Sequence, residues 1–385
     1  MNLGKTTEQQ LKTTRGPLFE SAELGFREYW YPALLSRHLG KKPVSVKILG
    51  ENLVFVRGGG RPYALFDRCA HRGMPLSAGH CLADGTITCP YHGWTYDLTD
   101  GSCVAAITDG PESAVVGKRG KEVKTYPVEE RMGLVYVYMG DDPPPPLEED
   151  VPGEMFDPAY ERQCVVAIWQ NNWRASLENG YDAAHAPFVH RYSMRWQTQM
   201  AFQPAYSGYV ENEPQGKYLR QIPRGGRAPD VAIYPRIGEW PRYSWLRKAL
   251  AKLGERNRRP GTVTQEFRLP CIIRNHYWYY SMIRWAVPVD ANTTRNFQVL
   301  LGPYTGNRAL AFRLQYWLWH RWVFHMMFNG QDEAITSKFD YLAPERLYRP
   351  DRSIVDLRKY IESHVRAEDG TRPERKAEDL AGLVS

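Results

Sequence analysis

Two short loops, each with one cysteine and one histidine, constrain this chain more than any other feature. They read CAH over residues 69–71 and CPYH over residues 89–92, and seventeen residues separate His71 from Cys89. A Cys₂His₂ zinc site is one interpretation, because zinc takes thiolate and imidazole ligands in tetrahedral sites. Zinc fingers, however, usually place two cysteines in one loop and two histidines in another. Mixed loops instead favour a two-iron, two-sulfide cluster in which two cysteines hold one iron and two histidines hold the other.

The residues beside these loops also suit a cluster. Gly73, Pro75, Pro90 and Gly93 predict rigid turns that aim backbone N–H groups at sulfides, and Trp94 is placed to shield one side. Histidine ligation raises the reduction potential of such a cluster above that of an all-cysteine cluster. We therefore expect an electron-transfer centre in this part of the chain.

The loops lie inside a β-rich segment. Over residues 43–139, short β-type runs such as VSVKIL, NLVFVR and LVYVYM alternate with glycine-containing turns. This pattern predicts an antiparallel β domain over residues 43–146, preceded by a helical lead-in over residues 1–42. Residues 141–146, two aspartates and four prolines, read as a stiff linker. A mixed α/β domain with a central antiparallel sheet flanked by helices is expected over residues 147–385, so the predicted fold class is α+β.

A second candidate metal site lies in the stretch NNWRASLENGYDAAHAPFVH, residues 171–190. Residues 171–186 are expected to form a helix, and Asp182 and His185, three residues apart, would share a face of it. Pro187 tends to break that helix, which would let His190 swing back toward His185. Two imidazoles with a carboxylate nearby suggest a two-histidine, one-carboxylate iron site with open coordination positions. The alternative is that both are ordinary surface or core histidines.

Composition narrows the class of protein. A chain of 385 residues has room for two domains, and its aromatic content of 13% suits both a large core and a ring-lined pocket. The net charge of +7 is not gathered in one tail. A basic charge is compatible with nucleic-acid binding but is equally suited to docking an acidic protein. We expect the protein partner and no nucleic acid.

Location and membrane association are also read from the sequence. Six cysteines are too few for a disulfide framework, and the first residues contain no apolar signal-like run, so we expect a reducing cytoplasmic environment. The most apolar segment, residues 309–328, is interrupted by Arg313, Gln315, His320 and Arg321. We therefore expect a buried or lid helix there, and no membrane span.

Together the motifs resemble a known family. CAHRGMPLS and CPYHGWTYD resemble the paired ligand loops of Rieske proteins. With the stretch at residues 171–190 they look like the catalytic α subunit of a Rieske non-haem iron oxygenase, over about residues 24–342. LGFREYWYP, LGENLV and DRCAHRG look most like the carbazole-dioxygenase branch, whose oxygenases are homotrimers of α subunits. The four residues between His185 and His190 exceed the spacing in that branch, a departure that bears on the substrate and not on the metal chemistry.

The resemblance implies a ligand for each metal position. The implied ligands of the Rieske cluster are Cys69, His71, Cys89 and His92. His185 and His190 match the histidines of the catalytic iron. The third ligand in the family is an aspartate on a late helix, which GQDEAITSKF places at Asp332. From the residues alone, Glu333 and Asp340 are rivals.

Asp182 matches the family's bridging aspartate. It would accept hydrogen bonds from His185 and from His92 of the partner subunit, across a head-to-tail trimer. A plain helix-surface carboxylate is the alternative. Glu178 lies one turn earlier on the same stripe and is expected to tune the bridge.

The resemblance further implies the function. The chain is expected to be the terminal oxygenase of a multicomponent system that uses O₂ to dihydroxylate an apolar aromatic or polycyclic substrate. Electrons would come from NAD(P)H through a reductase and a ferredoxin, since no Gly-x-Gly-x-x-Gly fingerprint follows a strand. Monooxygenation or oxidative demethylation of an aromatic or steroid-like substrate is the alternative, because the same iron site supports all three. An electron carrier with the cluster alone, and a structural zinc protein, are the interpretations from other classes.

Two further sets of residues are candidates on position alone. The candidate pocket residues are Tyr181, Phe188, Val189, Trp278, Met282 and Phe328, although residues of these types are more often plain core. The candidate residues for docking an acidic ferredoxin are Lys41, Lys42, Arg68 and Arg72, each of which is equally a solvated surface residue.

Overall fold

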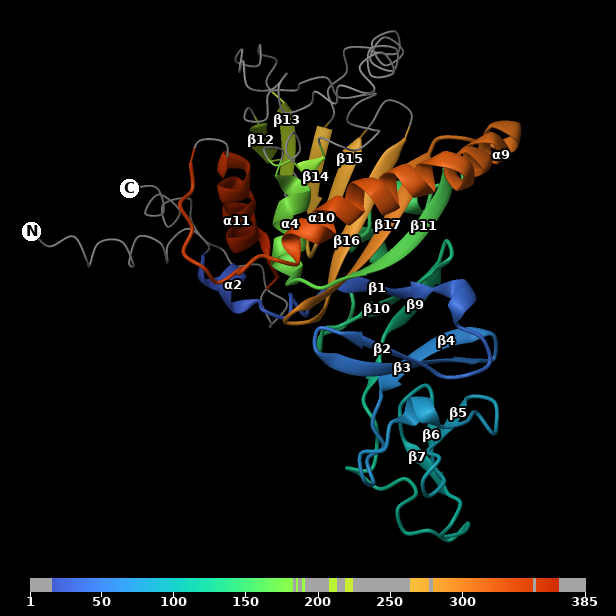
Figure 1. Cartoon of the computed structure of the whole chain (residues 1–385). Helices are drawn as coiled ribbons and strands as arrows, with labels where there is room; N and C mark the ends of the chain where they lie inside the picture. The colour runs from blue at the N-terminus through green and yellow to red at the C-terminus, as the bar shows by residue number, and fades with distance from the viewer. Residues whose placement is uncertain are drawn as a thin grey trace, which may run out of the picture.

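The computed structural model of the chain describes residues 16–182, 185, 189–190, 208–212, 219–223, 264–276, 280–348 and 351–366. These residues form an all-β lobe and a larger lobe in which helices lie against a broad sheet (Figure 1). The predicted α+β class, with the β domain first along the chain, is confirmed.

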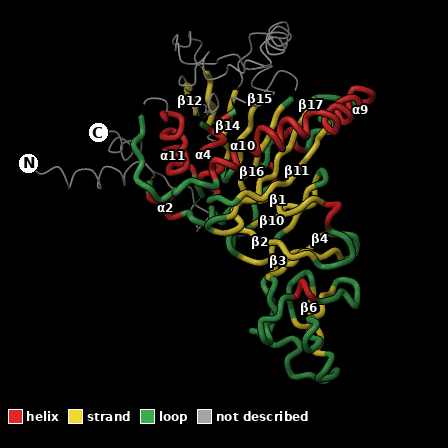
Figure 2. Tube along the Cα trace, viewed as in Figure 1, coloured by secondary structure: helices red, strands yellow, loops and turns green. Residues whose placement is uncertain are grey.

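The β lobe contains small antiparallel sheets with the strand orders β2-β3-β4-β8, β1-β10-β9 and β5-β6-β7. The strands are β1 (Trp30–Leu35), β2 (Val44–Ile48), β3 (Glu51–Gly58), β4 (Arg61–Phe66), β5 (Thr86–Thr88), β6 (Trp94–Asp97), β7 (Cys103–Ala106), β8 (Thr125–Tyr126), β9 (Val128–Arg131) and β10 (Leu134–Tyr138). One short helical turn, η1 (Ser36–His38), follows β1, and another, η2 (Leu76–Ala78), follows the first cysteine–histidine loop. Figure 2 shows that loops dominate the end of the lobe that carries β6.

Strand β3 joins two cores, because successive side chains of a strand point to opposite faces. Leu53 and Phe55 pack into the large core that continues into the other lobe. Val54 and Val56 pack into a smaller core that contains the two loop cysteines. The apolar run over residues 53–56 therefore attaches the cysteine–histidine end of the lobe to the rest of the molecule.

The helical lead-in expected over residues 1–42 is wrong at Trp30–Leu35, which is strand β1. This strand pairs antiparallel with β10, with Trp30 opposite Tyr138, and all of its residues are buried. Pro32 has no N–H to donate to a helix, and the aromatic residues before it favour a pleated, buried surface. Helix is present within the described part of the lead-in only at α2 (Pro17–Ser21) and the turn η1.

The second lobe is built on one antiparallel sheet with the strand order β11-β17-β16-β15-β14-β13-β12. Its strands are β11 (Glu161–Trp169), β12 (Gly208–Asn212), β13 (Leu219–Pro223), β14 (Thr264–Arg268), β15 (Ile272–His276), β16 (Ser281–Asp290) and β17 (Thr293–Gly302). Two short turns precede the sheet, α3 (Leu147–Asp150) and η3 (Gly153–Met155). The predicted central antiparallel sheet is confirmed.

Helices cover one face of this sheet (Figure 1). They are α4 (Trp173–Tyr181), α9 (Gly306–Gln315), η5 (Tyr316–Phe328) and α10 (Asn329–Thr336), while α11 (Arg352–His364) packs beside α2 and α4. The helix predicted at residues 309–328 is confirmed, and its second half has wider π-type turns. The expectation that this helix is buried is wrong, because most of its large apolar side chains, such as Trp317 and Leu318, are exposed. Within the described residues, no helix is both long and apolar enough to cross a membrane.

The helix expected over residues 171–186 ends earlier, at Tyr181. Asp182 is extended, with ψ of 119°, and its carboxylate accepts the backbone N–H of His185. An aspartate that binds a nearby backbone N–H competes with helix continuation, which explains the early end. Pro187, the predicted helix breaker, lies outside the described residues. The predicted domain limits at residues 42 and 146 stay predictions.

Candidate metal centres

Helix α4 directly precedes the first of the two centres, and the position of the helix is fixed at both ends. Asn172 caps its start, because the side-chain oxygen accepts the N–H of Arg174 at 3.0 Å. Near its end, a β-carbon on Gly180 would lie 1.9 Å from Nη2 of Arg284 on β16. Only glycine lets the helix approach the sheet this closely.

Asp182 contacts His185 by both backbone and side chain. Its Oδ2 accepts the backbone N–H of His185 at 3.2 Å and lies 3.4 Å from the ring Nδ1. Its own N–H donates to the carbonyl of Glu178 at 2.8 Å, which attaches it to the last turn of α4. The contact with His185 was predicted from a shared helix face, and that reason is wrong, because the two residues do not lie in one continuous helix.

Asp332 on α10 meets both histidines. Its Oδ1 lies 3.1 Å from His190 Nε2 and 3.4 Å from His185 Nε2. One ligand atom from each of these residues falls within 4.8 Å of the others. His190 and Asp332 are buried, with 0% and 3% of their surface exposed. The structure therefore brings together the three residues that the sequence proposed for one metal ion.

The chemistry of these side chains fits a metal ion. His190 Nε2 and Asp332 Oδ1 are buried and make no well-directed hydrogen bond, although they are 3.1 Å apart. Unsatisfied buried polar atoms are rare in folded proteins. Two imidazoles and one carboxylate are the donor set of non-haem Fe(II) sites with open positions.

The same contacts shift the ionisation of the metal-free site. Burial alone would lower the pKa of His185, but Asp182 and Asp332 raise it to about 9. Burial alone would raise the pKa of Asp332, but His185 and His190 hold it well below its usual value. Asp332 therefore keeps the negative charge that a divalent cation needs.

The rivals of Asp332 lie away from this cluster. Glu333 is only partly buried, and Asp340 is exposed. Neither belongs to a group of three potential ligands within the described residues.

Two neighbours on the same helical segment fix His190, and sequence reasoning missed one of them. Phe328 stacks on the ring at a centroid distance of 3.5 Å, in accord with its candidacy for the pocket. Gln331 Oε1 lies 3.1 Å from Nδ1 of His190, so the amide selects the tautomer that leaves Nε2 free to bind a metal. The sequence signal that could have identified this residue was the position of Gln331 directly before the predicted ligand Asp332.

The other candidate pocket residues lie in different parts of the structure. Tyr181 is fully buried in the main core. Met282 belongs to a separate buried cluster that also contains Tyr280, Leu300, Phe312, Tyr316 and Phe324. Val189 is half-buried. Phe188 and Trp278 lie outside the described residues.

The two cysteine–histidine loops have the same backbone geometry. Cys69 N–H donates to the carbonyl of Met74 at 2.8 Å, and Gly73 N–H donates to the carbonyl of Cys69 at 2.9 Å. The equivalent bonds around Cys89 are 2.8 and 3.1 Å. Gly73 and Gly93 both have positive φ, 72° and 69°, which each tight turn requires. The predicted rigid turns are confirmed.

The loops face each other with thiols inside and imidazoles outside. Cys69 and Cys89 are buried, whereas His71 is exposed and His92 is half-buried. The two imidazole centroids are 4.7 Å apart. Trp94 stacks on His71 at 4.8 Å and 9°, so the predicted shielding ring is in place.

Tyr96 is a further residue of this centre that sequence reasoning missed. Its hydroxyl lies 3.1 Å from Cys69 Sγ and accepts the N–H of Ala70 at 3.1 Å. The only available signal was its position two residues after Trp94 on β6, which points it into the smaller core.

Ligand spacing separates the cluster from zinc. Ligand atoms around one tetrahedral zinc ion lie within about 4 Å of each other, given metal–ligand bonds of 2.0–2.3 Å. Among the described residues, the four loop side chains are not part of any group of three close potential ligands. Two metal ions bridged by sulfide need the wider arrangement.

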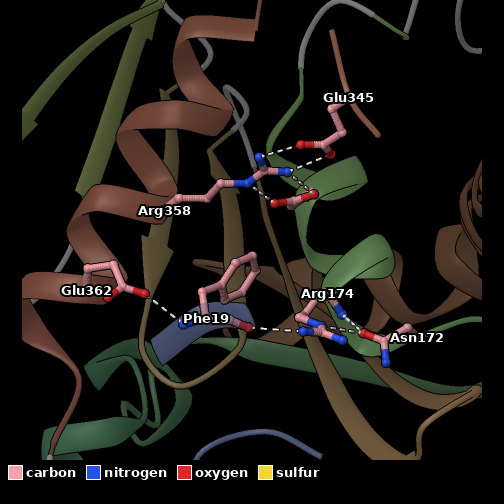
Figure 3. A network of polar contacts seen from close by, with 7 residues as sticks. Phe19, Asn172, Arg174, Glu345, Arg358 and Glu362 are labelled. Carbon is pink, nitrogen blue, oxygen red and sulfur yellow. Dashed lines mark hydrogen bonds and ion pairs between the residues drawn. The ribbon is translucent and has the colours of Figure 1, made fainter. Parts of the chain in front are cut away.

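Polar contacts connect helix α11 to α4 and to the start of the described chain (Figure 3). Arg358 binds Glu178 on α4 and also Glu345, and it is almost fully buried. Glu362 accepts the N–H of Phe19 at 2.7 Å, and Arg174 donates to the carbonyl of Phe19 at 3.1 Å. The start of the described chain, α4 and α11 are therefore connected through charged side chains.

The candidate docking residues are exposed. They are Lys41, Lys42, Arg68 and Arg72. Arg72 lies over the ring of Tyr91, 5.8 Å from its centroid, and so borders the second loop.

Comparison with known proteins agrees with both centres. Residues 29–127 match the Rieske [2Fe-2S] domain, and residues 138–369 match the homotrimeric ring hydroxylase family. The terminal oxygenase component of carbazole 1,9a-dioxygenase from Sphingomonas sp is 31% identical over 363 residues, which cover 90% of this chain and 93% of that protein.

Solved structures show the same architecture. The terminal oxygenase of carbazole 1,9a-dioxygenase from Nocardioides aromaticivorans IC177 is 27% identical, with a TM-score of 0.75 over 93% of this chain and 99% of that one. A fluorene-bound variant oxygenase of carbazole 1,9a-dioxygenase in complex with ferredoxin is 28% identical, with a TM-score of 0.74 over 93% and 96%. Terminal oxygenases of this type carry a Rieske [2Fe-2S] cluster and a mononuclear non-haem iron. The chain belongs to the homotrimeric ring hydroxylases, as a Rieske-type terminal oxygenase.

Proposed function

We propose that this oxygenase dihydroxylates an apolar polycyclic aromatic compound, with carbazole-like and fluorene-like ring systems as the first candidates. The observation that carries the proposal is the convergence of His185, His190 and Asp332 in a chain that also has two cysteine–histidine loops. Relatives named for carbazole and a neighbour with bound fluorene support a substrate with fused rings.

The proposed ligand sets follow the geometry. His185, His190 and Asp332 would hold the iron, whose open positions supply the place where O₂ is activated. The cluster would be held by Cys69, His71, Cys89 and His92. Phe328 stacks on His190, so an apolar wall adjoins the iron ligands and favours an aromatic ring beside them.

Asp182 is proposed as the connection between subunits. It orients His185 through two contacts and would accept a hydrogen bond from His92 of the partner subunit. His92 is only half-buried within its own chain, so its outer edge is available for such a contact. In a trimer with head-to-tail contacts, the same pair forms at every interface.

Electrons would reach the cluster from NAD(P)H through a reductase and an acidic ferredoxin. The exposed basic residues near the cluster are the proposed docking side. A reducing cytoplasm is the proposed location, since none of the six cysteines forms a disulfide bond.

Product analysis under ¹⁸O₂ tests the reaction. With carbazole or fluorene and a surrogate ferredoxin and reductase, dihydroxylation places two labelled atoms in one product molecule. One labelled atom per product would instead establish monooxygenation.

Iron content tests the metal assignment separately. The purified chain should contain three irons and show the visible absorption of a Rieske cluster. Two irons per chain would leave only an electron carrier, and a colourless zinc-containing preparation would exclude the cluster.

A further inference from the structure

A cavity of about 380 Å³ lies where the β lobe meets the edge strand of the broad sheet. Its walls come from η1, from the turn between β9 and β10, from β11 and from the start of η5. None of the proposed metal ligands lines it. The cavity is therefore separate from both metal centres, and its volume falls in the range of small-molecule sites.

The charged groups that line this cavity are all basic. They are Arg37, His38, Arg162 and Arg321, and no aspartate or glutamate is among the lining residues. Arg37 and His38 come from η1, Arg162 from β11 and Arg321 from η5. Segments far apart in the sequence thus bring three guanidinium groups and an imidazole to one hollow.

Nearby carboxylates are already engaged elsewhere. Glu161, beside Arg162, binds Arg313 at 2.8 Å on the outer side of α9. Glu130 on β9 binds Arg57 at 2.8 Å. Within the described residues, Arg37, Arg162 and Arg321 form no ion pair with a carboxylate, although Glu161 and Asp157 act on Arg162 electrostatically.

The donors of these groups are only partly used. Arg162 Nη2 donates to the backbone carbonyls of Glu154 and Asp157, but its Nε is buried without a hydrogen-bond partner. Arg321 lies over the ring of Trp317, 4.8 Å from its centroid. This contact fixes the guanidinium beside the cavity and leaves its in-plane N–H groups unused.

Tyr316 contributes a hydroxyl to the same wall. Burial raises the pKa of Tyr316 to about 12, while Arg321 and Arg37 act on it in the opposite direction. The two guanidinium groups are therefore within electrostatic reach of this hydroxyl. The hydroxyl keeps its proton at neutral pH and is a further hydrogen-bond donor.

We propose that this cavity binds a small anion that carries a carboxylate or phosphate group. Like charges facing one hollow repel each other, and an oxyanion would remove that repulsion while filling the unused N–H positions. Guanidinium groups bind carboxylate and phosphate through paired hydrogen bonds. The rings of Tyr316 and Trp317 would contact the apolar part of an organic anion.

Titration calorimetry on the iron-loaded protein tests the proposal. Inorganic phosphate and phthalate are the probes for the two anion types, each at an ionic strength held constant with sodium chloride. Arg37→Gln and Arg321→Gln change exposed side chains, so both variants are expected to fold. Arg308→Gln is the matched control, because it removes the same charge from α9 outside the cavity.

We expect saturable binding of at least one probe by the unmodified protein. Each cavity variant should weaken that binding about tenfold, the effect of losing a charged hydrogen bond of about 1.4 kcal/mol, and Arg308→Gln should leave it unchanged. The proposal is overturned if neither probe binds saturably, or if Arg308→Gln weakens binding as much as Arg321→Gln. The readout needs no turnover and so does not depend on the substrate proposed above.

Discussion

Arg358 donates two hydrogen bonds to Glu178, at 2.6 and 3.0 Å, and two more to Glu345, at 2.7 and 2.9 Å. Its side chain is 2% exposed. Because the carbonyl of Glu178 accepts the N–H of Asp182, this ion pair holds the turn from which Asp182 reaches His185. The expected influence of Glu178 on Asp182 therefore has a structural basis. Arg358, 180 residues later in the chain, holds Glu178 in place.

Arg358→Met should destabilise the protein by about 3 kcal/mol, because it leaves two largely buried carboxylates without their cation. Arg352→Gln is the matched control on the same helix, since Arg352 is 75% exposed and its pair with Asp356 contributes little. Urea unfolding followed by circular dichroism measures both variants. Equal stability of Arg358→Met and the unmodified protein would remove the role given to this ion pair.

Asp182→Asn should retain both metals yet lower turnover about 10- to 100-fold, the usual effect of losing a group that orients a metal ligand. The neutral amide no longer holds His185 and the neighbouring subunit's imidazole as a carboxylate does. Single-turnover reoxidation of the reduced cluster, with iron content as the reference, measures this loss. Asp340→Asn, at an exposed carboxylate, should behave like the unmodified protein. Normal reoxidation in Asp182→Asn would exclude the bridge.

Asp332→Ala should reduce the iron content from three to two per chain and abolish turnover. The variant removes the carboxylate that contacts both histidines, while the proposed cluster ligands lie in the β lobe. Metal analysis and the visible spectrum are read together. Glu333→Ala should keep all three irons, because Glu333 does not join the ligand group. Retention of the third iron by Asp332→Ala would move the ligand assignment to another residue.

Sequence patterns predicted the features whose determinants are local. The cysteine–histidine loops are set by residues within five positions of each other, so their turns could be read from Gly73 and Gly93.

Features that depend on distant partners were not predictable. Strand β1 was taken for helix because its hydrogen bonds go to β10, about a hundred residues away, and single-sequence patterns do not show that pairing. The Arg358–Glu178 pair and the basic cavity unite segments from opposite ends of the chain. Asp332 was chosen over Glu333 through a family resemblance, and what separates the two in the structure is the direction each side chain takes from α10.

Iron binding to the metal-free protein should depend on pH through His185. Its pKa of about 9 in the folded chain exceeds the ordinary 6.5, so protonation stabilises the metal-free fold. That contribution is complete below pH 6.5 and is lost as the pH rises through about 9. Iron binds the neutral ring of His185, so the apparent affinity of the protein for iron should rise over the same pH window. About one proton should be released for each iron bound at neutral pH.

Anaerobic titration calorimetry with Fe(II), in two buffers of different ionisation enthalpy, counts that proton. Asp182→Asn is the informative variant, because removing this carboxylate lowers the pKa of His185 and should reduce the proton release. A heat of binding that is the same in both buffers would contradict the raised pKa.

Tyr96→Phe should lower the reduction potential of the cluster. The Tyr96 hydroxyl accepts the N–H of Ala70, which directs its own proton toward Cys69 Sγ, 3.1 Å away. A hydrogen bond to a cluster sulfur stabilises the reduced, more negative state, so its loss disfavours reduction. A bond of about 1.4 kcal/mol corresponds to about 59 mV for one electron. Tyr91→Phe is the control, because Tyr91 is exposed and contacts His92 through its ring. Redox titration followed by electron paramagnetic resonance should find a shift in Tyr96→Phe alone, and an equal potential in both variants would show that this hydroxyl does not tune the cluster.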